Sequence, residues 1–296
     1  MSLSSAHTLP RLSENRDSAV FKSVILVVVV APFVALLFAI WQLWNRAIGW
    51  TDVLLLVGTY IPISLGVTAG FHRMLTHKSF VAHPAVKFSL LALGSMAIEG
   101  NCIGWAADHL LHHQLSDKSG DPHSPTEGLW HAHLGWLFDG KQADAAYYCP
   151  ALLKDRLICF VDRTFVLWVA LGLAVPFVIG GWHGLIWGGL VRVFFVHHVT
   201  WSVNSVCHTW GARPYATDDR SRNNWLVGLL AMGEGYHNSH HRWPRAAIHG
   251  MDRWQFDGAG WFIQLLEKVH LASQVCRISL ETRLRTRGRA TGVVQS

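Results

Sequence analysis

Histidine carries most of the potential chemistry of this sequence. The chain has 296 residues and 19 histidines, as many as its aspartates and glutamates together. Nine of the histidines fall into three closely spaced motifs and one single position. They are His72 and His77 in HxxxxH, His109, His112 and His113 in HxxHH, the single His208, and His237, His240 and His241 in a second HxxHH. Because chance rarely repeats such spacing, the motifs together indicate a metal centre.

The spacing within each motif indicates how the imidazoles could converge. Residues i, i+3 and i+4 of a helix lie on one face, so we expect each HxxHH motif to direct three imidazoles toward one point. His72 and His77 are about 140° apart around an α-helix and can converge only if the helix frays or bends between them. Neutral imidazole binds iron, zinc, copper or nickel. Nine such ligands exceed the needs of one ion, so the pattern predicts two.

Motifs that the chain lacks narrow the kind of metal site that the histidines can form. The chain lacks the HExxH pattern of zinc metalloproteases and the CxxC pairs of cysteine-based zinc sites. Two imidazole-bound metal ions in an apolar chain suggest oxygen activation on an apolar substrate. The other ten histidines are expected to be structural or at the surface: His7, His83, His123, His131, His133, His183, His197, His198, His249 and His270.

The composition indicates which elements position these residues. Apolar residues make up 51% of the chain and charged residues 15%, and there are 15 tryptophans, which is typical of a membrane protein. Apolar runs long enough to span a bilayer predict four transmembrane helices, at about 23–45, 53–71, 164–181 and 185–207. The run Phe88–Ile98 is shorter and predicts an interfacial or buried helix. Arg192, inside the fourth run, is expected to snorkel, to pair with a backbone carbonyl or to shape the site.

The distribution of positive charge predicts the topology. Of the 25 lysines and arginines, 3 precede the first run, 8 lie in residues 72–163 and 12 follow residue 207. Since positive charge marks the cytoplasmic side, we expect both termini and residues 72–163 and 208–270 there. The charge bias then requires no nucleic-acid partner. The predicted fold is an all-α integral membrane protein of four transmembrane helices with a cytoplasmic helical cap that carries a histidine-ligated di-metal site. Residues 1–20 are expected to be a flexible tail, 21–270 a single domain, and 271–296 a basic tail.

Residues 50–255 resemble the membrane-bound fatty acyl desaturases, in particular the stearoyl-CoA (delta-9) type. The resemblance rests on an ordered set of motifs along the chain. These are Gly70-Phe71-His72-Arg73 to His77, Asp108 to His113, Asp121-Pro122-His123, Gly135-Trp136, Trp201 to His208, and Gly235 to His241. It implies two iron ions, held by the nine histidines and by Asn204 through a water. It also implies that Asp108, Lys141 and Trp201 contact the acyl substrate.

The resemblance further implies the reaction. Such an enzyme uses O2 to introduce a cis double bond into a long-chain acyl group, and it needs two electrons from outside. The chain has no iron–sulfur cysteine spacing, haem attachment motif or GxGxxG loop. We therefore expect a separate electron donor, a ferredoxin or a cytochrome b5-like protein, on the cytoplasmic face.

Two positions depart from the acyl-CoA members of that family. Ala107 and Gly140 stand where those members carry arginines that hold the CoA head group. Since arginine binds phosphate in a bidentate manner, their loss predicts weak binding of CoA. An Arg at position 107 is then expected to strengthen that binding. The acyl carrier remains open among CoA, a phospholipid and a carrier protein.

Histidine motifs also occur in proteins of two other functions. A di-iron lipid or alkane hydroxylase would use similar histidine motifs, and only the product distinguishes it. A metal transporter is disfavoured, because transport needs polar groups along the membrane spans and these motifs lie at or beyond the cytoplasmic ends. The sequence leaves the double-bond position, chain length, electron donor and oligomeric state undecided.

Overall fold

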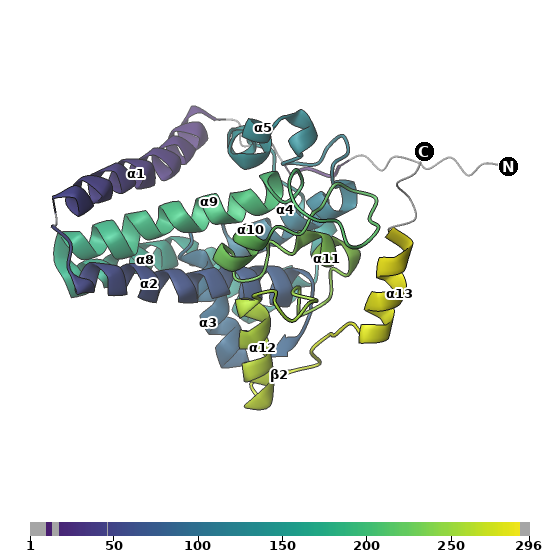
Figure 1. Cartoon of the computed structure of the whole chain (residues 1–296). Coiled ribbons are helices and arrows are strands. Elements are labelled where there is room, and N and C mark those ends of the chain that lie inside the picture. Colours follow the sequence, from purple (N-terminus) through teal and green to yellow (C-terminus); the bar gives the residue numbers. More distant parts are fainter. Residues whose placement is uncertain (1–9, 14–17, 46, 291–296) are drawn as a thin grey trace.

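Long apolar helices and a cap of shorter helices at one end of them make up the protein (Figure 1). A computed structural model provides the structure, which describes residues 10–13, 18–45 and 47–290. The α-helices are α1 (Ala19–Trp44), α2 (Trp50–Leu65), α3 (Pro84–Ser95), α4 (Cys102–Leu115), α5 (Leu129–His133), α6 (Ala145–Tyr148), α7 (Arg156–Arg163), α8 (Phe165–Gly184), α9 (Arg192–Ser205), α10 (Trp225–Leu230), α11 (His237–Arg242), α12 (Gly258–Lys268) and α13 (Leu280–Ala290). Two π-helices, η1 (Gly66–Thr76) and η5 (Leu185–Val191), extend α2 and precede α9, and three 3-10 turns are η2 (Pro125–Glu127), η3 (Gly135–Phe138) and η4 (Leu152–Lys154). The short strands β1 (Val81–Ala82) and β2 (Ala272–Ser273) pair antiparallel.

Three helical segments of the described residues are long and apolar enough to cross a membrane: Ala19–Trp44, Trp50–Thr76 and Phe165–Ser205. The third has 41 residues and would be about 60 Å long if straight, twice the thickness of a bilayer core. It is not straight, because Gly181 has the non-helical backbone angles φ 58° and ψ −144°. The segment folds back on itself there, and the two arms approach so closely that a side chain at Gly184 would collide with the carbonyl of Pro176. The third and fourth predicted spans are the two arms of this hairpin, and the number of membrane crossings stays a prediction.

Arg192 is the one charged residue at the centre of this hairpin. Its side chain is completely buried and donates hydrogen bonds to the backbone carbonyls of Met96 (2.7 Å), Gly172 (3.0 Å) and Gly188 (3.3 Å). The carbonyls replace the water that the guanidinium loses on burial. Pairing with backbone carbonyls was one of the expected solutions. Here it ties the end of α3 to both arms of the hairpin.

The end of the second long segment explains how His72 and His77 converge. The helix does not fray there; it widens into the π-helix η1, in which the His77 N–H donates to the His72 carbonyl at 3.1 Å. A bond that spans five residues puts more residues into each turn than an α-helix has. Positions i and i+5 therefore move toward the same face, and the two imidazole rings lie 4.9 Å apart.

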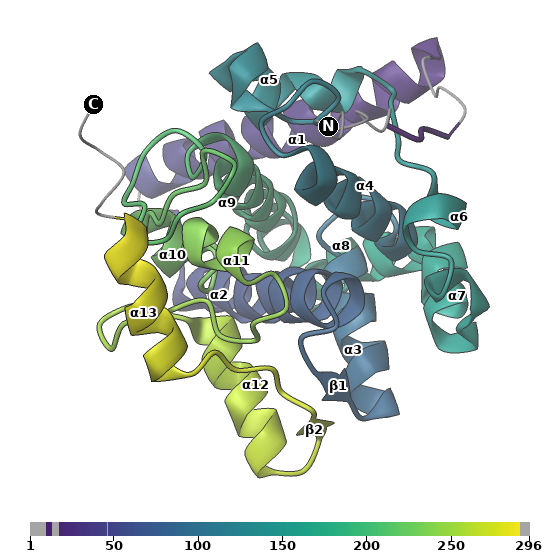
Figure 2. The ribbon, with the colours of Figure 1, turned by 90° about the vertical axis from the view of Figure 1, so that its right-hand side faces the viewer.

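A buried arginine joins this π-helix to the cap; Figure 2 looks onto the cap end, where α10, α11 and α12 lie beside α2. Arg73 is completely buried and contacts Glu234 (3.0 Å), Asp257 (2.9 Å) and the backbone carbonyl of Ala247 (2.8 Å). These partners come from three separate parts of the C-terminal third of the chain. The contacts position α11, which carries the last histidine motif, over the end of η1.

Parts of both predicted tails have defined structure. Residues 1–9, 14–17 and 291–296 lie outside the described residues. Leu12 forms a bridge with Ala143, and the Ser13 N–H donates to the Gln142 carbonyl at 2.8 Å. Near the other end, β2 pairs with β1, and α13 is held to the cap by an ion pair of 3.0 Å between Arg287 and Asp252.

Candidate metal centre

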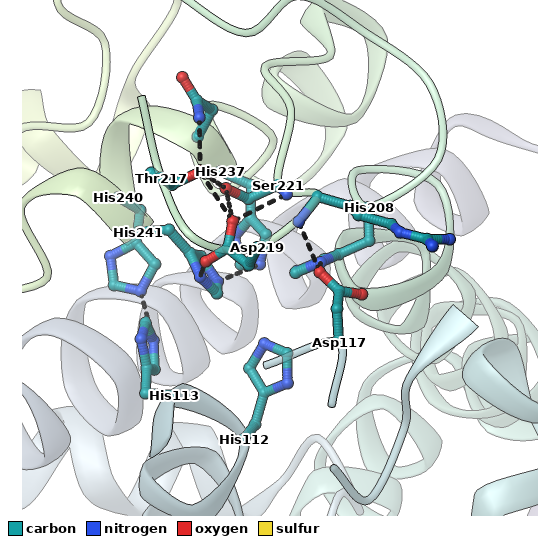
Figure 3. Close-up of polar contacts among 12 residues, drawn as sticks. His112, His113, Asp117, His208, Thr217, Asp219, Ser221, His237, His240 and His241 are labelled. Carbon is teal, nitrogen blue, oxygen red and sulfur yellow. Dashed lines mark hydrogen bonds and ion pairs between the residues drawn. The ribbon is translucent and has the colours of Figure 1, made fainter. Parts of the chain in front are cut away.

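All nine histidines of the predicted motifs meet in two adjacent groups at the cap end of the long helices. In each group one nitrogen per residue lies within 4.8 Å of the others. The five-histidine group consists of His72, His77, His109, His113 and His240. The four-histidine group consists of His112, His208, His237 and His241 (Figure 3). Each group could hold one metal ion.

The structure divides each HxxHH motif between the two groups. On α4, His109 and His113 belong to the five-histidine group and His112 to the other. On α11, His237 and His241 stay together and His240 crosses over. The expectation that each motif directs three imidazoles toward one point is therefore wrong. In an α-helix, residues i and i+4 differ in direction by about 40°, whereas i+3 and i+4 differ by about 100°.

The distances within the five-histidine group fit a shared cation. Four Nε2–Nε2 contacts join its residues in the order His72, His240, His113, His109 and His77, at 3.1, 2.8, 3.0 and 2.9 Å. Each Nε2 carries either a proton or one lone pair, so at most two of these four contacts can be hydrogen bonds. Nitrogens bound at right angles to one ion at about 2.1 Å would be about 3.0 Å apart. An ion that accepts every lone pair satisfies the whole group.

Carboxylates fix the other ring nitrogen of four of these histidines. Nδ1 of His72 lies 2.6 Å from Glu234, and that of His112 2.9 Å from Asp121. Nδ1 of His208 lies 2.8 Å from Asp117, and that of His241 2.6 Å from Asp219 (Figure 3). A proton held on Nδ1 leaves the lone pair of Nε2 for a metal and fixes the ring orientation. Nε2 of His112 and of His208 is buried and has no hydrogen-bond partner among the described residues. The donor set thus fits a metal in the four-histidine group as well.

The electrostatics of the site agree with its use as a ligand cage. Burial, together with the neighbouring imidazoles, holds the pKa of His109 and of His113 well below the usual value. Neutral imidazole is the form that binds metals. Burial opposes the ionisation of Asp121, but the His112 imidazole outweighs it, and the pKa of this carboxyl falls well below its usual range. The carboxylate therefore remains a charged acceptor for the His112 N–H.

None of these carboxylates was predicted to take part in the site. Two histidines beside them, His123 and His249, were expected to be structural or at the surface. His123 is buried beside His112 and Asp121, and completely buried His249 lies 3.3 Å from Glu234. Glu234 opens the segment Glu-x-x-His that ends at His237, a spacing known from soluble di-iron proteins. That spacing could have drawn attention to Glu234. Asp117 and Asp219 carry no comparable signal, because each reaches its histidine only through the folded chain.

A cavity of ≈ 450 Å³ leads from the histidine groups between the long helices. Its wall is mostly apolar and aromatic, and His72, His109 and His237 face it from the metal centre. The apolar lining includes Phe21, Ile25, Val28 and Val29 of α1, Val67 of η1, Val196, Val199 and Val203 of α9, Trp136 and Leu137 of η3, Trp105 of α4, and Phe165 of α8. The cavity can hold an extended apolar molecule with one part next to the imidazoles.

The predicted substrate contacts and Asn204 also line this cavity. Asp108, Lys141 and Trp201 are part of its wall, and Asn204 lies there together with His237. Asp108 accepts a hydrogen bond from the Ala143 N–H at 2.7 Å, and Lys141 is exposed near Asp139.

Ala107 has a different environment from the one expected. It is completely buried in the hydrophobic core with Ile103, Ala106 and Leu111. An arginine side chain at this position would start from the packed core, and its contact with the acyl head group stays a prediction. Gly140 does line the cavity, at φ +65°.

Comparisons with known proteins identify the family of the chain. A family model described as fatty acid desaturase matches residues 48–257. The chain is 36% identical over 267 residues to a hex-5-enoyl-[acyl-carrier protein] acetylenase of Moorena producens, which covers 83% of both chains. It is 41% identical over 214 residues to an acyl-CoA C20 Delta5-desaturase of Anemone leveillei, covering 71% of this chain and 69% of the relative. It is 38% identical over 219 residues to an sn-1 stearoyl-lipid 9-desaturase of Anabaena variabilis, covering 73% and 80%.

Proposed function

The chain belongs to the fatty acid desaturase family, and we propose that it introduces a cis double bond at the delta-9 position of a long-chain acyl group. Members of this family are oxidoreductases. The observation that carries the proposal is the position of the two histidine groups at the end of an apolar cavity. A hydrophobic chain in that cavity would present unactivated methylenes to the metal centre.

We assign two iron ions to the site. One would be held by the five-histidine group and the other by the four-histidine group, with Asn204 acting through a water. Iron suits imidazole ligands, and two bound irons would supply the oxidising power of activated O2. Glu234, Asp121, Asp117 and Asp219 hold the Nδ1 protons and so keep the imidazole rings in their binding orientation.

The reaction balances with two electrons from outside. Two C–H bonds on adjacent methylenes break and a C=C bond forms, which releases two electrons and two protons. Together with two external electrons and two further protons, these reduce O2 to two waters. The apolar wall, including Trp201, positions the acyl chain and excludes bulk water from the reacting carbons. Asp108 and Lys141 contribute a polar end to the cavity, where the head group of the substrate would lie.

The delta-9 position is proposed from the sequence motifs that resemble the stearoyl-CoA type. The relatives include a 9-desaturase and a Delta5-desaturase, and they act on acyl groups carried by a lipid, by CoA and by a carrier protein. Expression in a desaturase-deficient host, followed by mass analysis of its fatty acids, tests the proposal. A product lighter by two hydrogens with the double bond at carbon 9 is expected. A product heavier by one oxygen would identify a hydroxylase.

The chain is proposed to cross the membrane four times, with both termini and the metal centre in the cytoplasm. The hairpin at Gly181 supports two crossings within Phe165–Ser205. The positive charges of residues 72–163 and of the C-terminal third support the orientation. Single cysteines introduced at Ser279 and at Gly49 test it: an impermeant thiol reagent applied to intact cells should label only the second.

A further inference from the structure

A second, polar pocket approaches the metal centre from outside the acyl cavity. It has a volume of ≈ 280 Å³ and is lined by His113, Ser116, Lys118, Ala216, Thr217, Asp218, Asp219, His241 and Arg242. We call it the polar pocket. His113 and His241 are the two candidate ligands that line it, and they are also the two that are not fully buried as residues. The other seven ligands are buried.

This pocket reaches both histidine groups at once. His113 belongs to the five-histidine group and His241 to the four-histidine group. Their rings are stacked, with centroids 4.5 Å apart and planes 25° apart. The acyl cavity approaches other ligands, namely His72, His109 and His237. A bound acyl chain would fill that cavity and leave the polar pocket accessible.

Among the exposed charged side chains in and beside the polar pocket, the positive ones are in the majority. Lys118, Arg220 and Arg242 are exposed. The carboxylates of Asp117, Asp121 and Asp219 are also charged, but each is bound to an imidazole and none is exposed. Asp218 is the exposed acid at the rim. The Ser116 hydroxyl oxygen is buried and has no hydrogen-bond partner among the described residues. The pocket therefore presents cationic side chains and an unpaired hydroxyl group to an acidic binding partner.

We propose that the polar pocket is the docking site of the electron donor, a small acidic one-electron carrier protein. A carboxylate of the carrier lies between Lys118 and Arg242, and its redox group lies next to His113 and His241. This inference rests on the proposed function, which requires two electrons for each double bond. Each docking event oxidises one reduced carrier by one electron, so two events complete one turnover together with the two protons that balance the waters.

Zero-length cross-linking locates the contact directly. The probe is a plant-type [2Fe–2S] ferredoxin, mixed with the full chain in lipid nanodiscs and treated with a carbodiimide. Mass spectrometry should find Lys118 joined to a carboxylate of the ferredoxin. Lys268, an exposed lysine on α12 outside the pocket, serves as the control and should remain unlinked. Cross-links at Lys268 but not at Lys118 would overturn the proposal.

Equilibrium binding measures the contribution of charge. The double variant Lys118→Glu, Arg242→Gln should bind the ferredoxin at least about tenfold more weakly at low salt, and the difference should shrink at high salt. Lys268→Glu should bind as the wild type does. Asp218→Lys should bind several-fold more tightly, which is a gain that misfolding cannot produce. Equal affinity in all four proteins would exclude this docking site.

Two further outcomes are distinguishable. Inorganic phosphate that binds in the pocket without ferredoxin binding there would show a small-anion site and overturn the docking proposal. Failure of the proposed function has a separate signature, because ferredoxin would then bind at Lys118 while reduced ferredoxin and O2 yielded no double bond in any acyl substrate. Iron content, measured on each variant, shows whether the metal centre itself has been lost.

Discussion

The two ends of the long helices both carry polar clusters, and the clusters differ in how their polar atoms are satisfied. At the end opposite the cap, Gln42, Asp52, His183 and Trp187 form what we call the far-end cluster. Trp187 donates to Gln42 at 3.1 Å, and His183 lies 3.4 Å from both Gln42 and Asp52. Within the described part of the chain, no side-chain polar atom of this cluster is both buried and without a partner.

At the cap end, by contrast, imidazole nitrogens converge on one another in numbers that hydrogen bonds cannot satisfy. Nε2 of His112 and of His208 is buried without a partner among the described residues, and at most two of the four Nε2–Nε2 contacts in the five-histidine group can be hydrogen bonds. A buried polar group without a partner costs about 1–3 kcal/mol. A fully paired cluster is therefore a structural feature, whereas a converging, unpaired one indicates a bound cation.

The largest expected difference between the ends follows removal of one imidazole from each. His109→Ala removes a nitrogen that lies 2.9 and 3.0 Å from those of His77 and His113. We expect loss of iron from the five-histidine group and a fall in desaturation of more than about 100-fold, since a ligand should count for more than its outer partners. His183→Ala should keep both irons. Metal analysis and product analysis of both proteins decide the matter, and two irons with normal activity in His109→Ala would remove it from the ligand set.

A smaller difference is expected when a carboxylate behind an imidazole is neutralised. Asp121 is 2% exposed and accepts from His112 at 2.9 Å, so Asp121→Asn should weaken metal binding by about 10- to 100-fold. Asp52→Asn, the matched change in the far-end cluster, should leave metal affinity unchanged. Competition with a chelator measures both. Equal losses in the two variants would mean that the effect reflects general stability and not the orientation of His112.

The buried carboxyl group of Glu99 should make the free energy of unfolding depend on pH. This residue lines the acyl cavity and accepts from Trp105 at 3.3 Å, and burial raises its pKa to about 7. Because the unfolded chain ionises this carboxyl at a lower pH than the folded chain, stability falls as pH rises from about 4.5 to about 7, by at most about 3 kcal/mol.

Thermal unfolding at several pH values, in wild type and Glu99→Gln, checks the role of Glu99. Between pH 4.5 and 7 the stability of the wild type should fall more steeply with pH than that of Glu99→Gln, because only the wild type loses stability from this group. Parallel curves for the two proteins across that range would contradict the raised pKa.

The smallest effect is expected from the far-end cluster itself. Trp187→Phe removes the hydrogen bond to Gln42 and should lower the free energy of unfolding by about 1 kcal/mol. Iron content and activity should not change, because the residue lies at the opposite end of the helices from the histidine groups. A loss of iron in this variant would contradict the view that the far-end cluster is purely structural.

The sequence by itself determined the residue types of the candidate ligands and the long helices. The nine histidines, the apolar runs and the break near Gly181 are local patterns, so each could be identified from residues close to one another in the chain. Asp108, Lys141, Trp201 and Asn204 were identified through resemblance, and all four lie along the cavity. The expectation that His72 and His77 converge only through a distortion of the helix was also correct.

Only the tertiary structure decided how these parts combine. It divided each HxxHH motif between two groups, because the partners of His240 are His72 and His113, 168 and 127 residues away. It solved the spacing of His72 and His77 with a π-helix, a change of hydrogen-bond register that the sequence pattern did not specify. It buried Ala107 and brought Asp117 and Asp219 onto His208 and His241. Local periodicity fixes the direction of a side chain on its own helix, but the ligand group it joins depends on contacts between distant segments.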